Sequence, residues 1–220
     1  MLPLCMGIRD AGRPITTVVA LGAHSDDIEI GCGGTVLRLA EEYPDASVHW
    51  MVLSGGGERE AEARASAQSF LEGFAASRVV VEGFRDGYFP YIGATVKDWF
   101  ESLKGEVSPD LILTHHRHDL HQDHRLVCEL TWNTFRDHLI LEYEIPKFDG
   151  DFGRPNVFVP LTRADARRKV DMILSHFGTQ HARQWFTQEL FEGAMRIRGM
   201  ECNAAEGLAE AFYGRKLVLS

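Results

Sequence analysis

Residues 16–35 read TTVVALGAHSDDIEIGCGGT and combine a strand pattern, a polar cluster and a glycine-rich segment. Its first seven residues are mostly β-branched or apolar, a composition typical of a buried strand. His24, Asp26 and Asp27 follow that strand directly and precede the glycine-rich residues 31–35. Because adjacent carboxylates repel each other, a cation, a substrate or water must offset the repulsion in this loop.

Strand and helix patterns alternate along most of the chain. Strands are predicted at residues 16–22, 47–54, 78–84, 111–114, 139–145 and 156–160. Helices are predicted at residues 36–42, 58–74, 96–107, 126–138, 162–176, 184–196 and 204–212. This alternation predicts an α/β fold with a Rossmann-like, mostly parallel sheet and helices on both faces. We expect residues 1–220 to form a single domain, in which residues 147–220 complete the substrate pocket.

The composition argues against two classes of partner. The 220 residues carry a formal net charge of −9, which argues against a nucleic-acid-binding protein. No apolar run reaches the ~18 residues of a membrane-spanning helix, and the N-terminal residues do not resemble a signal peptide. The cysteines form no CxxC pair, which favours reduced thiols in a cytoplasmic protein; they are Cys5, Cys32, Cys128 and Cys202. The sequence leaves a homo-oligomer open.

A second polar cluster follows the strand predicted at residues 111–114. Residues 114–125 read THHRHDLHQDHR, and the carboxyl ends of parallel strands meet at one edge of a sheet, so both clusters should lie together. His and carboxylate ligands suit a borderline divalent ion, zinc first, with another transition metal as the alternative. The first cluster supplies His24 and one of Asp26 and Asp27, and the second supplies a histidine. The unused aspartate is then a general base.

The glycine-rich residues 31–35 are interpreted as structural. They do not fit the dinucleotide-binding GxGxxG pattern, because Val36 occupies the position of the last glycine. The two aspartates just before them would also repel a pyrophosphate. We expect these glycines to form a tight turn and to pack close to the sheet.

The two clusters together resemble the signatures of the PIG-L/LmbE-like zinc de-N-acetylases. Residues 23–27 (AHSDD) and 31–35 (GCGGT) are similar to AHPDD and GxGGT, although Ser25 replaces the common Pro and Ile28 the common Glu. The second signature, HxxxDxHxDH, is matched by His115, Asp119, His121, Asp123 and His124. Weaker similarity extends the resemblance over nearly the whole chain.

The resemblance implies a role for each matched residue. The zinc ligands would be His24, Asp27 and His124. Asp26 would be the general base that takes a proton from the attacking water. His121 would stabilise the tetrahedral oxyanion, and Asp123 would hold the charge of a neighbouring imidazole.

The resemblance and the helix at residues 58–74 each suggest a further contact with substrate. Asp86 matches an aspartate that reaches the sugar in relatives. Arg64 or Arg59 would bind a substrate hydroxyl or phosphate, with a solvated helix face as the alternative for both.

The expected function is hydrolysis of an N-acetyl group from a small-molecule amino sugar, which is part of a glycoside, a nucleotide sugar or a glycolipid. Two alternatives stay open. One is a zinc amidohydrolase that acts on a non-sugar acyl amine. The other is a non-catalytic metal-binding module, against which the pairing of a base, Asp26, with His121 argues.

Overall fold

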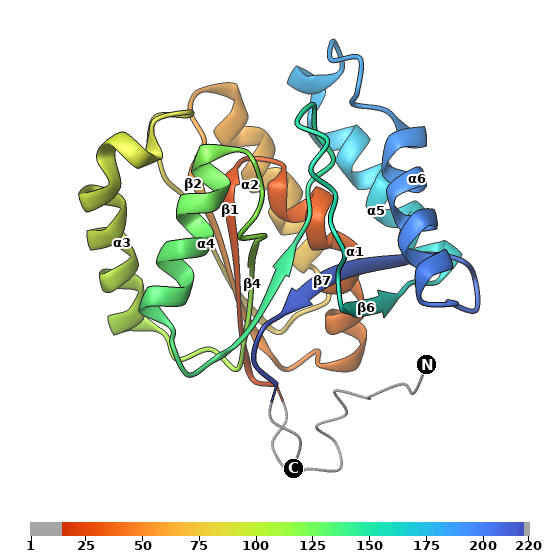
Figure 1. Cartoon of the computed structure of the whole chain (residues 1–220), viewed down its shortest axis with the longest axis horizontal. Coiled ribbons are helices and arrows are strands. Elements are labelled where there is room, and N and C mark those ends of the chain that lie inside the picture. Colours follow the sequence, from red (N-terminus) through yellow and green to blue (C-terminus); the bar gives the residue numbers. More distant parts are fainter. Residues whose placement is uncertain (1–14, 218–220) are drawn as a thin grey trace.

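The computed structural model describes residues 15–217 as one sheet between layers of helices (Figure 1). The strands are β1 (Thr17–His24), β2 (Ser47–Ser54), β3 (Ala76–Val81), β4 (Leu111–His115), β5 (Leu139–Tyr143), β6 (Val157–Pro160) and β7 (Ala209–Gly214). The α-helices are α1 (Asp27–Glu42), α2 (Glu58–Leu71), α3 (Gly93–Glu106), α4 (Gln122–Thr134), α5 (Arg163–His176) and α6 (Gln188–Glu201). Two short 3-10 helices are η1 (Phe89–Ile92) and η2 (Gly178–Gln180).

The seven strands form one sheet in the order β3-β2-β1-β4-β5-β7-β6. Neighbouring strands are parallel from β3 to β5, whereas β7 is antiparallel to both β5 and β6. The chain moves outward from β1 to β3 and then returns to place β4 on the other side of β1. The carboxyl ends of β1 and β4 therefore meet at a topological switch point, where open α/β sheets bind ligands.

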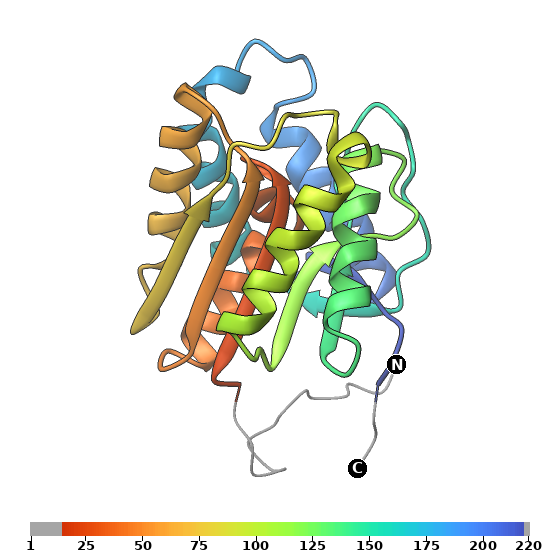
Figure 2. The same cartoon turned by 90° about the vertical axis from the view of Figure 1, so that its left-hand side faces the viewer.

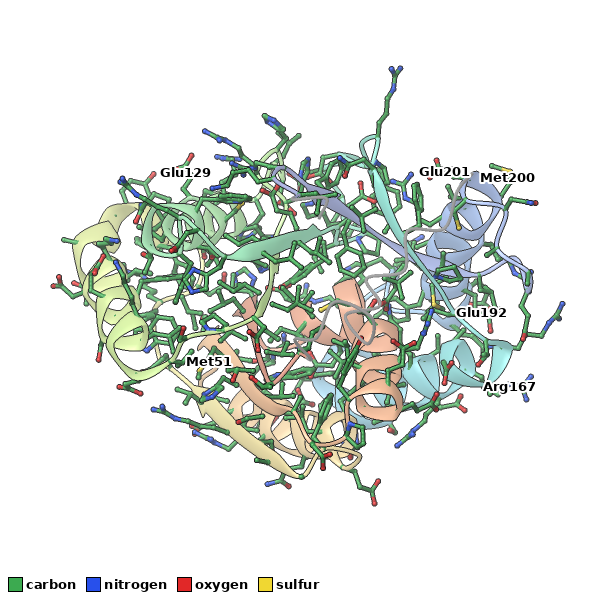
Figure 3. All side chains as sticks on the ribbon, turned by 90° about the horizontal axis from the view of Figure 1, so that it is seen from below. Met51, Glu129, Arg167, Glu192, Met200 and Glu201 are labelled. Carbon is green, nitrogen blue, oxygen red and sulfur yellow. The ribbon has the colours of Figure 1, made fainter. Side chains whose placement is uncertain are left out.

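The helices cover both faces of the sheet, which confirms the predicted fold class. Val18 of β1 packs in the core shared with α1, α2 and α5, whereas its neighbour Val19 packs in the core shared with α3 and α4. Figure 2 shows α3 and α4 in front of the sheet. Seen from below, Met51 lies inside these layers, whereas Met200 projects from the surface (Figure 3).

The glycine-rich segment lies inside helix α1 and does not form the predicted turn. The helix already begins at Asp27, and it departs from helical geometry at Cys32, where φ is −144°. The close packing expected of the glycines is observed: a Cβ on Gly31 would lie 2.1 Å from the ring of Tyr143. The glycines are therefore needed for close approach, and those of α1 all have negative φ.

The helix predicted at residues 204–212 is wrong, because residues 209–214 form strand β7. Alanine and glutamate favour a helix in this segment. However, the residues from Ala209 to Phe212 are all buried and pair with β5 and β6. Strand pairing and burial on both faces have overridden local propensity.

A buried ion pair between β7 and α5 occupies the break in α1. The Glu210 carboxylate accepts hydrogen bonds from the Gly34 and Thr35 backbone N–H groups at 2.8 and 2.6 Å. The Lys169 ammonium donates to Glu210 at 2.6 Å and to the Ile30 carbonyl at 2.7 Å. In an unbroken helix Gly34 would donate to Ile30, so the ion pair supplies new partners for this N–H group and this carbonyl.

Other boundaries move by a few residues. The helices predicted at residues 126–138 and 184–196 occupy Gln122–Thr134 and Gln188–Glu201. Cys32, Cys128 and Cys202 are free thiols, whereas Cys5 lies outside the described residues. Among residues 15–217, no helix is long and apolar enough to cross a membrane.

Candidate active site

The first part of the site is the junction between β1 and α1. His24 is the last residue of β1, Asp26 is the N-cap of α1, and Asp27 is its first residue. The backbone N–H of His24 donates to Asp27 Oδ2 at 2.6 Å, which folds the Asp27 side chain back towards the end of the strand. A helix N-terminus is favourable for carboxylates, because its free N–H groups carry partial positive charge.

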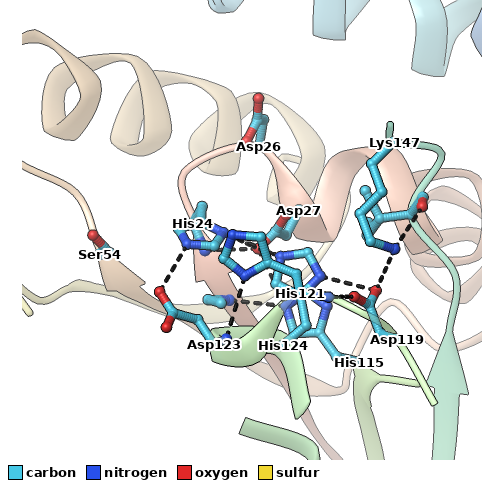
Figure 4. Close-up of polar contacts among 12 residues, drawn as sticks. His24, Asp26, Asp27, Ser54, His115, Asp119, His121, Asp123, His124 and Lys147 are labelled. Atoms are coloured by element: carbon cyan, nitrogen blue, oxygen red, sulfur yellow. Dashed lines mark hydrogen bonds and ion pairs between the residues drawn. The ribbon is translucent and has the colours of Figure 1, made fainter. Parts of the chain in front are cut away.

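The second part of the site is the junction between β4 and α4, which lies beside the end of β1. His121 is the N-cap of α4, and its Nδ1 accepts a hydrogen bond from the Asp123 backbone N–H at 3.3 Å. Asp123 and His124 follow in the first turn of the helix, and both side chains are buried. The two halves of the site thus come from segments about a hundred residues apart (Figure 4).

Three donor atoms from these junctions form a small triangle. His24 Nδ1 lies 3.1 Å from His124 Nε2 and 3.3 Å from Asp27 Oδ2, and the latter two atoms are 3.5 Å apart. In a tetrahedral zinc site with bonds of about 2.0–2.1 Å, two ligand atoms lie about 3.3 Å apart. The donor set and its spacing therefore fit a divalent transition metal, as the sequence indicated.

Two more histidines adjoin the triangle. His115 Nε2 lies 3.2 Å from Asp27 Oδ2, and the His115 ring stacks on His124 with centroids 3.9 Å apart. Donor atoms of His24, His121 and His124 also lie within 4.8 Å of one another, as do those of Asp27, His115 and His124. Each of these groups is a candidate to hold a metal ion, and both contain His124.

The two imidazoles of the triangle each have a second ring nitrogen that points away from its centre, and carboxylates contact these nitrogens. Asp119 Oδ2 lies 2.9 Å from His124 Nδ1. Asp123 and Asp86 lie 3.3 and 3.0 Å from His24 Nε2. Carboxylates behind metal-binding histidines fix the ring orientation and the tautomer. The expected contact of Asp123 with a neighbouring imidazole is present, and Asp86, whose side chain is 73% exposed, lies at the open side of the cluster.

The electrostatic field differs between the two adjacent aspartates. Burial would raise the pKa of Asp27, but the nearby His124, His115 and His24 hold it well below its usual value. For Asp26 burial dominates and raises the pKa, although the Arg59 guanidinium 2.9 Å away opposes the rise. Asp27 is thus suited to be a permanently charged ligand, and Asp26 to accept a proton.

His121 is suited to donate a hydrogen bond. Burial and the neighbouring His24 lower its pKa, which favours the neutral imidazole. Because Nδ1 accepts a hydrogen bond from a backbone N–H group, the single proton of the neutral ring belongs on Nε2.

The arginine that joins the cluster is Arg59, not Arg64. Arg64 Nε donates to Glu60 at 2.9 Å, and Nη1 donates to the Val79 carbonyl, so this side chain lies along the α2–β3 surface. Arg59, at the start of α2, binds Asp26, and its Nη1 is buried without a hydrogen-bond partner in the described structure. Both arginines were candidates from the sequence. The sequence could not choose between them, because it does not show which side of α2 faces β1.

Lys147 was not predicted. Its ammonium lies 2.9 Å from Asp119, behind His124. No motif marks this residue, because it lies in the loop after β5 and reaches the site only through the fold.

Comparisons with known proteins find relatives of the chain by sequence and by fold. The chain is 27% identical to the uncharacterized deacetylase YaiS of Escherichia coli K12 over 145 residues, which cover 59% of this chain and 74% of that protein. The N,N'-diacetylchitobiose deacetylase of Pyrococcus horikoshii is 19% identical with a TM-score of 0.71, over 97% of this chain and 87% of that chain. The 4-carboxy-2-hydroxymuconate hydratase GalB of Pseudomonas putida KT2440 is 16% identical with a TM-score of 0.73, over 94% of this chain and 98% of that chain.

At such low identity the two structural matches show a common fold. The family comparison is more specific, because the profile of the GlcNAc-PI de-N-acetylases (PIG-L) matches residues 19–135, more than half of the chain. That range contains both junctions and every donor of the triangle. The chain therefore belongs to the GlcNAc-PI de-N-acetylase (PIG-L) family.

Proposed function

We propose that the protein is a metal-dependent hydrolase that removes an N-acetyl group from an amino-sugar substrate, with zinc as the metal. The observation that carries the proposal is the triangle of His24, Asp27 and His124 beside an aspartate that is not one of its donors. Three protein ligands leave a coordination position open, which is the arrangement of catalytic zinc sites. Structural zinc sites use four protein ligands.

The reaction divides between the ion and the side chains. A bound divalent ion would polarise the acetamide carbonyl and make a coordinated water more acidic. Asp26 accepts the proton that the attacking water loses. The Nε2–H group of His121 donates a hydrogen bond to the carbonyl oxygen as negative charge develops there. When the C–N bond breaks, the amine nitrogen takes up the proton that Asp26 accepted, so the aspartate is ionised again and the products are acetate and a free amine.

Arg59 and Asp86 are the proposed contacts with the remainder of the substrate. The Arg59 Nη1 atom is buried and has no hydrogen-bond partner in the described structure, so a substrate oxygen would satisfy it. Asp86 is exposed at the edge of the cluster and can accept hydrogen bonds from sugar hydroxyls. Residues 147–220 complete this pocket in our proposal.

The names of related proteins support the chemistry. The family is named for a GlcNAc-PI de-N-acetylase, YaiS is described as a deacetylase, and one structural match is a deacetylase of N,N'-diacetylchitobiose. The hydratase among the matches shows that the fold alone does not specify deacetylation. The choice between deacetylation and another reaction therefore depends on the side chains of the site.

Acetate release from a panel of N-acetyl sugars and N-acetyl amino acids tests the proposal. We expect zinc-dependent release from sugars, and Asp26→Asn should lower kcat by about 10²–10⁴-fold. Asp45→Asn, the same change at an exposed position in the α1–β2 loop, is the matched control and should leave kcat unchanged.

Each other outcome favours a stated alternative. Turnover confined to acyl amino acids would identify a non-sugar amidohydrolase. Zinc binding without turnover of any compound would indicate a non-catalytic module. Full activity of the Asp26→Asn variant would contradict the assigned base.

A further inference from the structure

Lys147 reaches the candidate metal site from outside both sequence signatures. It lies just after β5, and its side chain is 13% exposed. The ammonium group donates to Asp119 Oδ2 at 2.9 Å and to Asp151 Oδ1 at 2.7 Å. It also donates to the Ile145 carbonyl at 3.3 Å, so all three of its hydrogen bonds are made to this chain.

Asp119 is the residue through which this lysine meets the metal site. Its side chain is 2% exposed, and it lies directly behind His124. Oδ1 accepts from the His121 backbone N–H at 2.8 Å, and Oδ2 receives both His124 Nδ1 at 2.9 Å and the Lys147 ammonium. A buried carboxylate in this position needs a counter-charge, and Lys147 supplies a full one.

The orientation of Asp119 determines the orientation of His124. When the carboxylate accepts the Nδ1 proton, Nε2 keeps its lone pair, and Nε2 is the atom that faces His24 and Asp27. Lys147 and the His121 backbone N–H hold one carboxylate oxygen each. The carboxylate is therefore fixed at both oxygens, and the imidazole ring is fixed with it.

The same lysine connects two loops at the site. Asp151 Oδ2 accepts from the Leu120 backbone N–H at 2.7 Å, and Asp151 also binds Lys147. Figure 4 shows the Lys147 ammonium in contact with Asp119, whose carboxylate also meets the His124 imidazole. The loop after β5 and the loop after β4 are thus joined at one buried ammonium group.

We propose that Lys147 is a positioning residue for the metal site, which acts through Asp119 to fix the metal ligand His124. The proposal rests on the proposed metal site but concerns a residue to which neither signature assigns a role. It implies that the loop after β5 contributes to metal affinity although it provides no ligand.

Zinc affinity, measured by competition with a chromophoric chelator, tests this proposal without an activity assay. Changes in residues that orient metal ligands typically lower affinity by 10–100-fold. We expect Lys147→Met to lower zinc affinity by about 10-fold, and Lys147→Arg, which keeps the charge, to restore most of the loss. Lys104→Met, at an exposed position on α3, is the matched control and should bind zinc like the wild-type chain.

A double-mutant cycle separates positioning from general damage to the fold. If Lys147 acts through Asp119, the double variant Asp119→Asn/Lys147→Met should bind zinc about as tightly as Asp119→Asn alone. This variant also removes the buried Asp119 charge that Lys147→Met leaves behind, while Asp151 keeps its hydrogen bond from the Leu120 backbone N–H. It therefore provides a second test if the single variant folds poorly.

Two results would overturn the role of Lys147 but leave the proposed metal site standing. One is wild-type zinc affinity in Lys147→Met, and the other is a double variant in which the two losses of zinc affinity add in full. Failure of the wild-type chain to bind zinc, or binding that survives His124→Ala, would overturn the proposed metal site itself.

Discussion

Replacing Glu210 by Gln tests the buried ion pair that occupies the break in α1. Glu210 Oε1 accepts from Lys169 and from the Gly34 N–H, and Oε2 accepts from the Thr35 N–H and hydroxyl. The substitution removes the charge and replaces one acceptor oxygen by an NH₂ group. Whichever way the amide lies, that NH₂ group faces at least one backbone N–H donor.

The magnitude follows from what the variant leaves buried. The Lys169 side chain is 4% exposed and would lose its counter-charge, and removing one partner of a buried ion pair costs about 3–5 kcal/mol. An unsatisfied buried N–H group costs about 1–3 kcal/mol, although local adjustment offsets part of it. We therefore expect Glu210→Gln to lower the free energy of unfolding by about 3–5 kcal/mol, out of a typical total of about 5–15 kcal/mol.

Urea unfolding at pH 7, followed by far-ultraviolet circular dichroism, measures this difference. Glu206→Gln is the matched control, because Glu206 is 43% exposed and its ion pair with Arg163 should contribute less than about 1 kcal/mol. A loss below about 1 kcal/mol for Glu210→Gln would refute the reasoning, since the ion pair would then not be a buried support of α1.

Three further predictions follow from the fold and the site. Gly31→Ala places a Cβ 2.1 Å from the buried Tyr143 ring, and we expect overpacking to lower the free energy of unfolding by about 1–3 kcal/mol or more, measured by urea unfolding. Burial would raise the pKa of Glu142, but hydrogen bonds from His116, the Arg117 N–H and Trp132, together with the Arg215 charge, hold it below its usual value. A depressed pKa stabilises the fold above the unfolded-state value, so the destabilisation by Glu142→Gln should be full at pH 7 and shrink below about pH 4; a loss independent of pH would contradict this. In the deacetylation assay Arg59→Gln should raise KM and lower kcat, whereas Arg64→Gln should leave both unchanged, and equal effects would contradict the placement of the two arginines.

The sequence predicted the parts of the fold that local patterns determine. Strand β1 has a continuous β-branched and apolar run, and the alternation of strands and helices predicts a mostly parallel sheet. The parallel arrangement then places the two polar clusters at one edge. The proposed metal donors could be named from the sequence because both clusters lie at strand ends and match known signatures.

What the sequence could not predict depends on contacts between distant segments. Residues 209–214 contain helix-favouring Ala and Glu, and only pairing with β5 and β6 makes them a strand. The choice between Arg59 and Arg64 depends on how α2 is rotated against the sheet. The sequence around Lys147 contains no motif that marks it, and its partner Asp119 belongs to another loop. Their contact therefore becomes visible only in the fold.

The close packing of Gly31 against Tyr143 has a consequence for comparing related sequences. A side chain at this position is excluded by the shape of the core, whether or not the neighbouring aspartates carry out any reaction. A descendant that had lost catalysis would still be selected to keep this glycine in order to fold. Glycine matches in the first signature therefore report ancestry and packing. If the proposed roles hold, only the proposed base Asp26, the proposed hydrogen-bond donor His121 and the proposed metal donors distinguish an active relative from an inactive one.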